Sequence, residues 1–401
     1  MTNMNNWDKQ IYNFAAAVIS SIDPVNTFLS NRDIVIKYKP IVLLFDGKQS
    51  VITNNMFYKE YKNGTYQIKP IANYQNLGVL NLGIFSSSDS QILQIASFVN
   101  LDSNIVSLLP KYFKKENNQN FADLADLIEY IINEKLNISS IPYFLEDSLN
   151  SSGMKNDEKV YKSTLYYCVL RRLSGGISTT DRFPISNDYI DADEIFRLMK
   201  STRRNEIDFE KRAKTLYCFL LKMYILKFSS KKNAPYKTEQ LLDFCNNELG
   251  IYLESGLYIS FLYFEGKNNT VKNFFQKVTP SAKNIFKKIE GMSWDLFHIW
   301  NIPTEMAICS NEDIIQLQSI ASGDKALIDM ISVNPIERIF MYNDEAIVKY
   351  RYSLVSLPET KYLCEKICLN REKRLSINKS VNLDVLSKSL EQALLDLFKC
   401  Y

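Results

Sequence analysis

The sequence contains a single histidine, His298, and seven cysteines that are scattered along the chain and odd in number. One histidine argues against a zinc site built from Cys and His ligands, and cysteines in no pairing pattern predict reduced thiols in a cytoplasmic protein. Glycine is scarce, with 12 residues in 401, and none belongs to a phosphate-binding loop ending in Lys-Ser/Thr or to a turn around a serine nucleophile. These absences argue against a P-loop nucleotide enzyme and against a serine hydrolase.

Long apolar runs are also missing. The most apolar stretch, Leu216–Phe228, contains Lys222 and is too short to cross a bilayer. The first residues, MTNMNNWDKQ, are polar and lack the basic-then-apolar order of a signal peptide. We therefore expect no membrane segment and a cytoplasmic location.

The composition is that of a folded globular protein, with 46% hydrophobic and 23% charged residues. A length of 401 residues predicts more than one lobe, and the net charge of +3 by itself indicates no class of partner. We expect four segments: a strand-rich module (1–90), two halves of an α/β domain (91–150 and 291–401) and a helical, partly basic insertion (151–290).

The N-terminal module combines a predicted helix at 8–20 with several short apolar runs. We interpret these runs as strands: Ile34–Tyr38, Ile41–Phe45, Tyr66–Ile71 and Leu77–Phe85. The dipeptides Asp46-Gly47 and Asn63-Gly64 supply hairpin turns. Asp46 also ends an apolar run and is a rival for the first catalytic acid, but glycine follows it rather than a helix.

Two stretches predict a buried strand that ends in an acid and leads into a helix. In Ile95–Leu109 an apolar run ends at Asp102, and hydrophobic residues then resume at helical spacing. In the second stretch a strand at 313–322 precedes Asp324, where a helix begins. An acid at the carboxyl end of a parallel strand lies where open α/β sheets bind their ligands, although Asp102 may equally cap the following helix.

Two further acids, Glu146 and Asp295, lie near predicted helix starts that face the same sheet edge. Four converging carboxylates repel one another unless a cation neutralises them. An all-oxygen cluster suits Mg²⁺ or Mn²⁺, which would activate water and hold a scissile phosphate.

The sequence Asp102-Ser103-Asn104 after an apolar strand resembles the first motif of the PIN-domain nucleases. The later acids of that family are similar to Phe144-Leu145-Glu146, Trp294-Asp295-Leu296 and Ser322-Gly323-Asp324-Lys325. The resemblance implies a PIN-like parallel sheet flanked by helices, in which Asp102, Glu146, Asp295 and Asp324 bind metal and carry catalysis. It further implies that Ser103 and Asn104 orient Asp102 and that Lys325 contacts phosphate. The 149 residues between Glu146 and Asp295 (295 − 146) require a large helical insertion.

The predicted function is metal-dependent cleavage of phosphodiester bonds, in RNA rather than DNA, with a toxin or phage-defence role by analogy. Residues 151–232 carry 17 Lys and Arg against 10 Asp and Glu, and Arg171 and Arg172 with nearby tyrosines form a candidate nucleic-acid surface. The alternative for that segment is a solvated helical face. For the whole protein the alternatives are an inactive scaffold of the same fold and a DNA or flap-type nuclease.

Several assignments stay open on sequence grounds. Glu305 or Asp313 could replace Asp295 as the third acid, and a lone histidine such as His298 more often packs or forms a hydrogen bond than acts as a base. The sequence also leaves open a protein inhibitor, a defence partner and a homo-oligomeric state.

Overall fold

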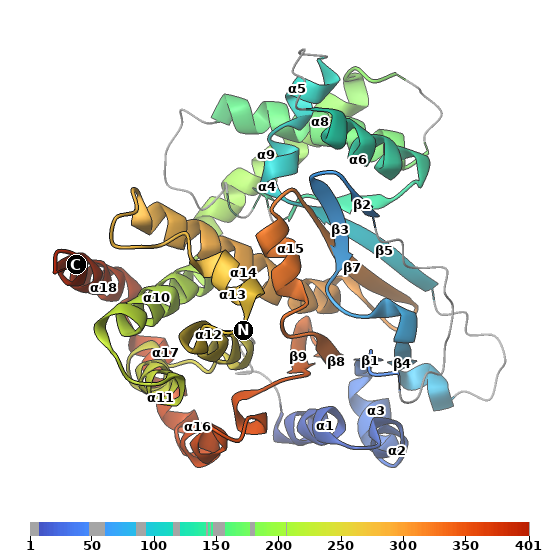
Figure 1. Ribbon diagram of the computed structural model, residues 1–401. Coiled ribbons are helices and arrows are strands. Elements are labelled where there is room, and N and C mark those ends of the chain that lie inside the picture. Colours follow the sequence, from blue (N-terminus) through green and yellow to red (C-terminus); the bar gives the residue numbers. More distant parts are fainter. Residues whose placement is uncertain are drawn as a thin grey trace.

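The computed structural model describes most of the chain. It covers residues 8–47, 61–85, 94–114, 121–141, 143–144, 146, 157–176, 181–205 and 207–400, with only the backbone at 201–205, 207–208 and 371. The architecture is α/β, as predicted, with two sheets and a large helical part (Figure 1).

The larger sheet has five strands in the order β2-β3-β7-β5-β6. Their bounds are β2 (Tyr61–Asn63), β3 (Tyr66–Pro70), β5 (Gln94–Leu101), β6 (Asn137–Ser139) and β7 (Ile314–Ser322). The strands β7, β5 and β6 are parallel, and β3 and β2 form the predicted hairpin at Asn63-Gly64, with β3 antiparallel to β7. Leu101 pairs with Ala321 and Asn100 with Ser139, so the three parallel strands end at one edge of the sheet.

The smaller sheet is antiparallel, in the order β4-β1-β8-β9. Its strands are β1 (Ile41–Leu44), β4 (Gly78–Leu80), β8 (Ile336–Tyr342) and β9 (Glu345–Tyr350). The strands of the N-terminal segment thus form no sheet of their own, because β1 pairs with β8 and β3 pairs with β7. Both sheets unite chain segments that are far apart in the sequence.

One predicted strand is a helix. The run at 34–38 lies in α3 (Arg32–Tyr38), which ends at Lys39 in the left-handed conformation. Val35 is fully buried against α1 (Lys9–Ser20), and Tyr38 bonds to Asp8 at its start. Packing against α1 and α2 (Pro24–Leu29) therefore decides the conformation of an apolar run too short to be assigned from its pattern.

Helices cover both faces of the five-stranded sheet. One face carries α4 (Ser103–Val106), α5 (Leu109–Phe113), α6 (Ala122–Asn133), α8 (Asp157–Ser174) and α9 (Ser186–Asn205), which share a core with Val99 and Leu101. The other face carries α14 (Ile285–Cys309) and α15 (Lys325–Ile331), which contact β7. The acid-bearing strand ends therefore lie between two helical layers.

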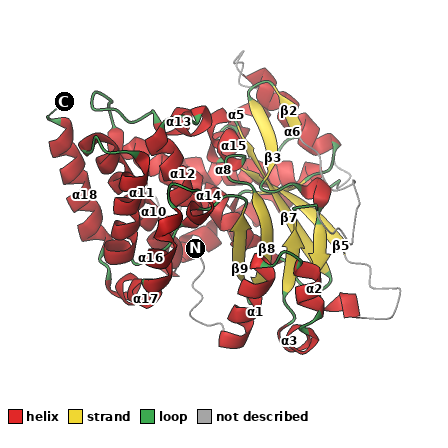
Figure 2. Cartoon of the chain, turned by 60° about the horizontal axis from the view of Figure 1, so that its bottom comes forward, coloured by secondary structure: helices red, strands yellow, loops and turns green. Residues whose placement is uncertain are grey.

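The remaining helices form a bundle beside the sheets, seen at the left of Figure 2. They are α10 (Ile207–Ser229), α11 (Ala234–Phe244), α12 (Glu254–Glu265), α13 (Asn269–Phe275), α16 (Cys364–Leu369), α17 (Arg371–Ser380) and α18 (Leu383–Phe398). The long helix α14 contacts α10 in the bundle as well as β7, β8 and β9, and so joins the bundle to both sheets. Among the described helices, none has the length and apolar character needed to cross a membrane.

Candidate active site

Asp102 follows the central parallel strand directly. Its backbone N–H donates to Ala321 O at 3.0 Å, which continues the pairing of β5 with β7 by one residue. Its side chain accepts from Ser322 Oγ at 2.5 Å and from Asn104 Nδ2 at 2.6 Å, but makes no capping bond to α4. Asp102 thus occupies the N-cap position of α4, as the capping alternative predicted, but its carboxylate binds Ser322 and Asn104 instead of capping the helix.

The pKa of Asp102 lies above its ordinary value. Burial is the main cause, and the negative charge of Asp324 raises the pKa further, while hydrogen bonds from Ser322 and Ser103 lower it. The carboxylate of Asp102 is thus held in a desolvated place beside a second acid, with donors that favour its charged form.

Ser322, the last residue of β7, connects the two strand ends. Its buried hydroxyl donates to Asp102 and accepts from Asn104 Nδ2 at 3.1 Å and from the Asp324 N–H at 2.9 Å. Asn104 Oδ1 also accepts from the Gly323 N–H at 3.2 Å, and Ser103 Oγ lies 3.3 Å from Asp102 Oδ1. Ser103 and Asn104 contact Asp102, as the resemblance implied. The sequence analysis did not predict that Ser322 bridges the two strand ends, although Ser322 belongs to the motif Ser322-Gly323-Asp324-Lys325.

Asp324 caps the helix that follows β7. Its Oδ1 accepts from the N–H groups of Ala326 at 2.8 Å and Leu327 at 3.3 Å, which leaves Oδ2 to pair with Lys277 Nζ at 3.1 Å. Lys325 is the exposed first residue of α15. No sequence signal pointed to Lys277, because it lies 47 residues before its partner and outside every motif.

Asp295 lies in the middle of α14, not near a helix start, so that part of the prediction is wrong. Its pKa is raised well above the ordinary value, first by burial and then by the charges of Asp102 and Asp324, and Glu146 adds to the effect. Lys277 acts in the opposite direction. No described residue donates a hydrogen bond to its carboxylate, so Asp295 is a desolvated acid facing the other three.

Glu146 lies beyond the third parallel strand, β6, seven residues after Ser139. It lies in a helical turn that starts at Ile141, two residues after β6, and it is followed by residues 147–156 outside the described part. Its charge acts on Asp295. Asp295 is thus within electrostatic reach of the other three sequence-predicted acids, and Asp102 is within reach of Asp324.

The rival acids lie elsewhere. Glu305 is ten residues beyond Asp295 on α14, about 15 Å along the axis, and accepts from Asn301 at 2.9 Å. Asp313 precedes β7, so the strand separates it from Asp324 by about 30 Å. Asp46 forms a buried ion pair with Arg338 at 3.0 Å in the other sheet.

Arg172 is not available to a substrate, which corrects the prediction for this residue. Its side chain is buried, its Nε donates to Asp188 at 3.0 Å, and its Nη2 donates to the backbone oxygens of Asp181 and Phe183. Arg171 is half exposed and pairs with Asp191 at 2.5 Å. Arg172 therefore holds α8 to α9, and because it is buried the alternative of a solvated helical face does not describe it either.

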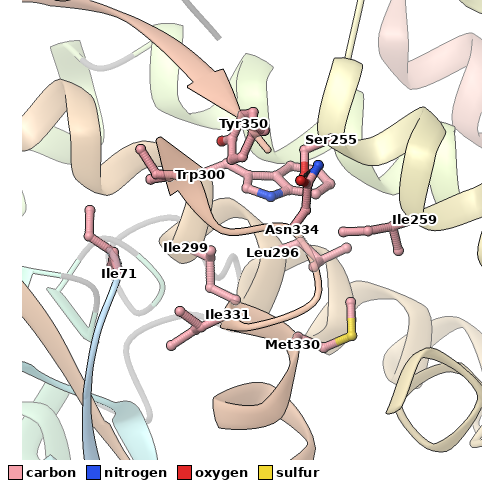
Figure 3. Close-up of a pocket in the computed structure, with 11 residues that line it drawn as sticks. Ile71, Ser255, Ile259, Leu296, Ile299, Trp300, Met330, Ile331, Asn334 and Tyr350 are labelled. Carbon is pink, nitrogen blue, oxygen red and sulfur yellow. Dashed lines mark hydrogen bonds between the residues drawn. The ribbon is translucent and has the colours of Figure 1, made fainter. Parts of the chain in front are cut away.

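His298 packs, as its residue type suggested. Its ring stacks on Trp294 at 5.7 Å between centroids, and burial lowers its pKa to about 3. The cavity in Figure 3, about 10 Å³ in volume, lies on another side of α14 between Leu296, Ile299 and Trp300. Neither feature includes any of the four acids, and the cavity is part of the apolar core.

The donor chemistry of the four acids fits a hard divalent cation, because all are carboxylates and their mutual repulsion is only partly offset by Lys277. Across the described residues, however, no three Asp, Glu, His or Cys side chains stand close enough to hold a metal ion. Binding of an ion would therefore require the carboxylates to close around it, with Lys277 Nζ leaving Asp324.

Comparison of the chain with family models, with curated proteins and with solved structures finds no match. The resemblance to the PIN-domain nucleases consequently rests on the sequence motifs alone.

Proposed function

We propose that the protein is a PIN-like, metal-dependent nuclease that cleaves phosphodiester bonds, in RNA in preference to DNA. The observation that carries the proposal is the juxtaposition of Asp102 and Asp324 at the ends of two paired parallel strands, where Ser322 bonds to both residues. Asp295 and Glu146 lie close enough for the charges to act on one another. Proteins do not gather desolvated carboxylates without a counter-charge, and perturbed acids at a sheet edge are typical of functional sites.

The four carboxylates would hold Mg²⁺ or Mn²⁺. When bound, such ions polarise a water molecule and neutralise charge at phosphate. The residues of the chain prepare the site. Ser322 and Asn104 fix the position of Asp102, and the hydrogen bond from Ser322 favours its ionised form. The capping bonds occupy Oδ1 of Asp324 and leave Oδ2 to Lys277. Lys325 at the rim is placed to attract a phosphate.

Cleavage of labelled single-stranded RNA and DNA in Mn²⁺, Mg²⁺ or EDTA tests the proposal. We expect cleavage only with metal and its loss in Asp102→Asn, with the fold retained by circular dichroism. Asp313→Asn is the matched control, because it neutralises an exposed acid at the opposite end of β7. Cleavage that persists in Asp102→Asn, or that falls equally in both variants, would overturn the assignment. A preference for DNA would identify the DNA or flap-type alternative.

An inactive scaffold of the same fold is the second candidate. Two observations favour it: Lys277 already pairs with Asp324, and no described set of ligands is close enough to hold an ion. Absence of cleavage on every substrate, together with no stabilisation of the protein by Mn²⁺ in thermal unfolding, would support this candidate.

A further inference from the structure

The chain between Lys267 and Ile289 carries six lysines and no acidic residue. This segment follows the bundle helix α12 and includes α13, which packs against α15, the helix that begins next to Asp324. Its lysines are exposed in the structure. One of these lysines, Lys277, lies directly beside the acids, whereas Arg172, predicted to bind nucleic acid, is buried.

Two of these lysines have positions defined by contacts. Lys277 Nζ pairs with Asp324 Oδ2 at 3.1 Å, and its side chain remains 40% exposed. Lys288 Nζ donates to Lys277 O at 3.2 Å, which ties the start of α14 to the same segment. Both ammonium groups can thus reach a phosphate without breaking a buried contact.

Lys288 and Asp295 lie on the same face of α14, seven residues or two turns apart. Gly291 lies between them on that face, three residues after Lys288 and four before Asp295. It is exposed, and a Cβ atom added to it would meet no described atom within 4 Å. Glycine destabilises a helix relative to alanine. Because the space around Gly291 is open, packing within the described part of the protein gives no reason for glycine here. Close approach of a ligand is one recognised reason for a glycine.

We propose that the face of α14 formed by Lys288, Gly291 and Asp295, together with Lys277, binds a phosphodiester backbone and leads it to the acids. This assignment rests on the proposed function for the nature of the ligand. Nucleic acid is favoured over an anionic membrane because the proposed function gives the adjoining acids a phosphodiester to act on, whereas these four residues include no apolar side chain that would insert into a bilayer surface.

Fluorescence anisotropy with labelled single-stranded RNA and DNA of about 16 nucleotides, in EDTA, measures binding without cleavage. We expect Lys277→Met and Lys288→Glu each to weaken binding on the order of tenfold and to reduce the salt dependence by about one unit of slope. Gly291→Trp should block binding with an unchanged circular dichroism spectrum, and Gly291→Ala should bind more weakly than wild type while being more heat-stable.

The matched control is Lys9→Glu, which reverses an exposed lysine on α1, at the bottom of Figure 1. Wild-type affinity in both Lys288→Glu and Gly291→Trp, or an equal loss in Lys9→Glu, would overturn the proposal. So would binding to phosphatidylserine vesicles without binding to either oligonucleotide. Binding that depends on these residues without any cleavage in Mn²⁺ would uphold this inference and refute the nuclease. Metal-dependent cleavage by the wild type, with unaffected binding in the variants, would uphold the nuclease and refute this inference.

Discussion

Replacement of Ser322 by alanine tests how the site holds the charge of Asp102. The hydroxyl is fully buried, donates to Asp102 Oδ2 and accepts from the N–H of Asp324. A hydrogen bond to a charged group contributes about 1.5–3 kcal/mol, and an unsatisfied buried N–H costs about 1 kcal/mol more. We therefore expect Ser322→Ala to lower the free energy of unfolding by about 2.5–4 kcal/mol at about pH 8.

The loss should shrink as the pH falls. The folded-state pKa of Asp102 is above its ordinary value, so the ionised carboxylate costs stability at high pH. This cost decreases as the pH falls from the folded-state pKa towards the lower unfolded-state pKa, and it is absent below both. The Ser322 hydrogen bond favours the ionised form. Removal of this hydrogen bond in Ser322→Ala raises the pKa of Asp102 further. The loss of stability is therefore largest at the pH values where Asp102 is charged.

Urea unfolding followed by circular dichroism at about pH 8 and about pH 5 measures both quantities. Ser163→Ala is the matched control, since the Ser163 hydroxyl is equally buried and has no hydrogen-bond partner among the described residues. We expect a small, pH-independent effect for it. A loss below about 0.5 kcal/mol in Ser322→Ala, or one that is equal at both pH values, would refute the account of Asp102.

Three further variants test individual residues. Asp295→Asn should abolish metal-dependent cleavage yet raise the free energy of unfolding by about 1 kcal/mol at neutral pH, because it removes a desolvated, repelled charge. The cleavage assay checks the first result and urea unfolding the second. A lower free energy of unfolding in the variant would contradict the prediction. His298 has a folded-state pKa of about 3, below the unfolded value, so the unfolded chain takes up its proton first. Stability should therefore fall by about 2 kcal/mol from about pH 7 to about pH 5 in wild type relative to His298→Phe, and parallel pH profiles would refute this. Arg172→Met should lower the free energy of unfolding, measured in urea, by about 3–5 kcal/mol, because it leaves the Asp188 carboxylate buried without its ion-pair partner. Arg171→Met should lower it by under about 1 kcal/mol, because that ion pair is half exposed. Equal losses in the two variants would contradict the burial argument.

The sequence by itself determined the two strand–acid–helix junctions. An apolar run that ends in Asp102 or Asp324 and is followed by helical spacing is a local pattern, and β5, β7, α4 and α15 form where that pattern predicts them. The α/β class follows from the same local patterns. Parallel pairing then had to bring the two junctions to one sheet edge, so their convergence could be inferred before any coordinates were known.

Tertiary structure decided the rest, because it depends on contacts between residues that no local rule connects. Lys277 pairs with an acid 47 residues away, and Ser322 with one 220 residues away. Arg172 looked like an exposed cation until the packing of α8 on α9 buried it against Asp188. The mid-helix position of Asp295 was missed although the helical pattern of α14 continues through it, but which acids it meets was out of reach of the sequence. Sequence periodicity specifies which face of an element is apolar, but only packing decides which polar groups are desolvated together, and desolvation is the main cause of the raised pKa values of Asp102 and Asp295.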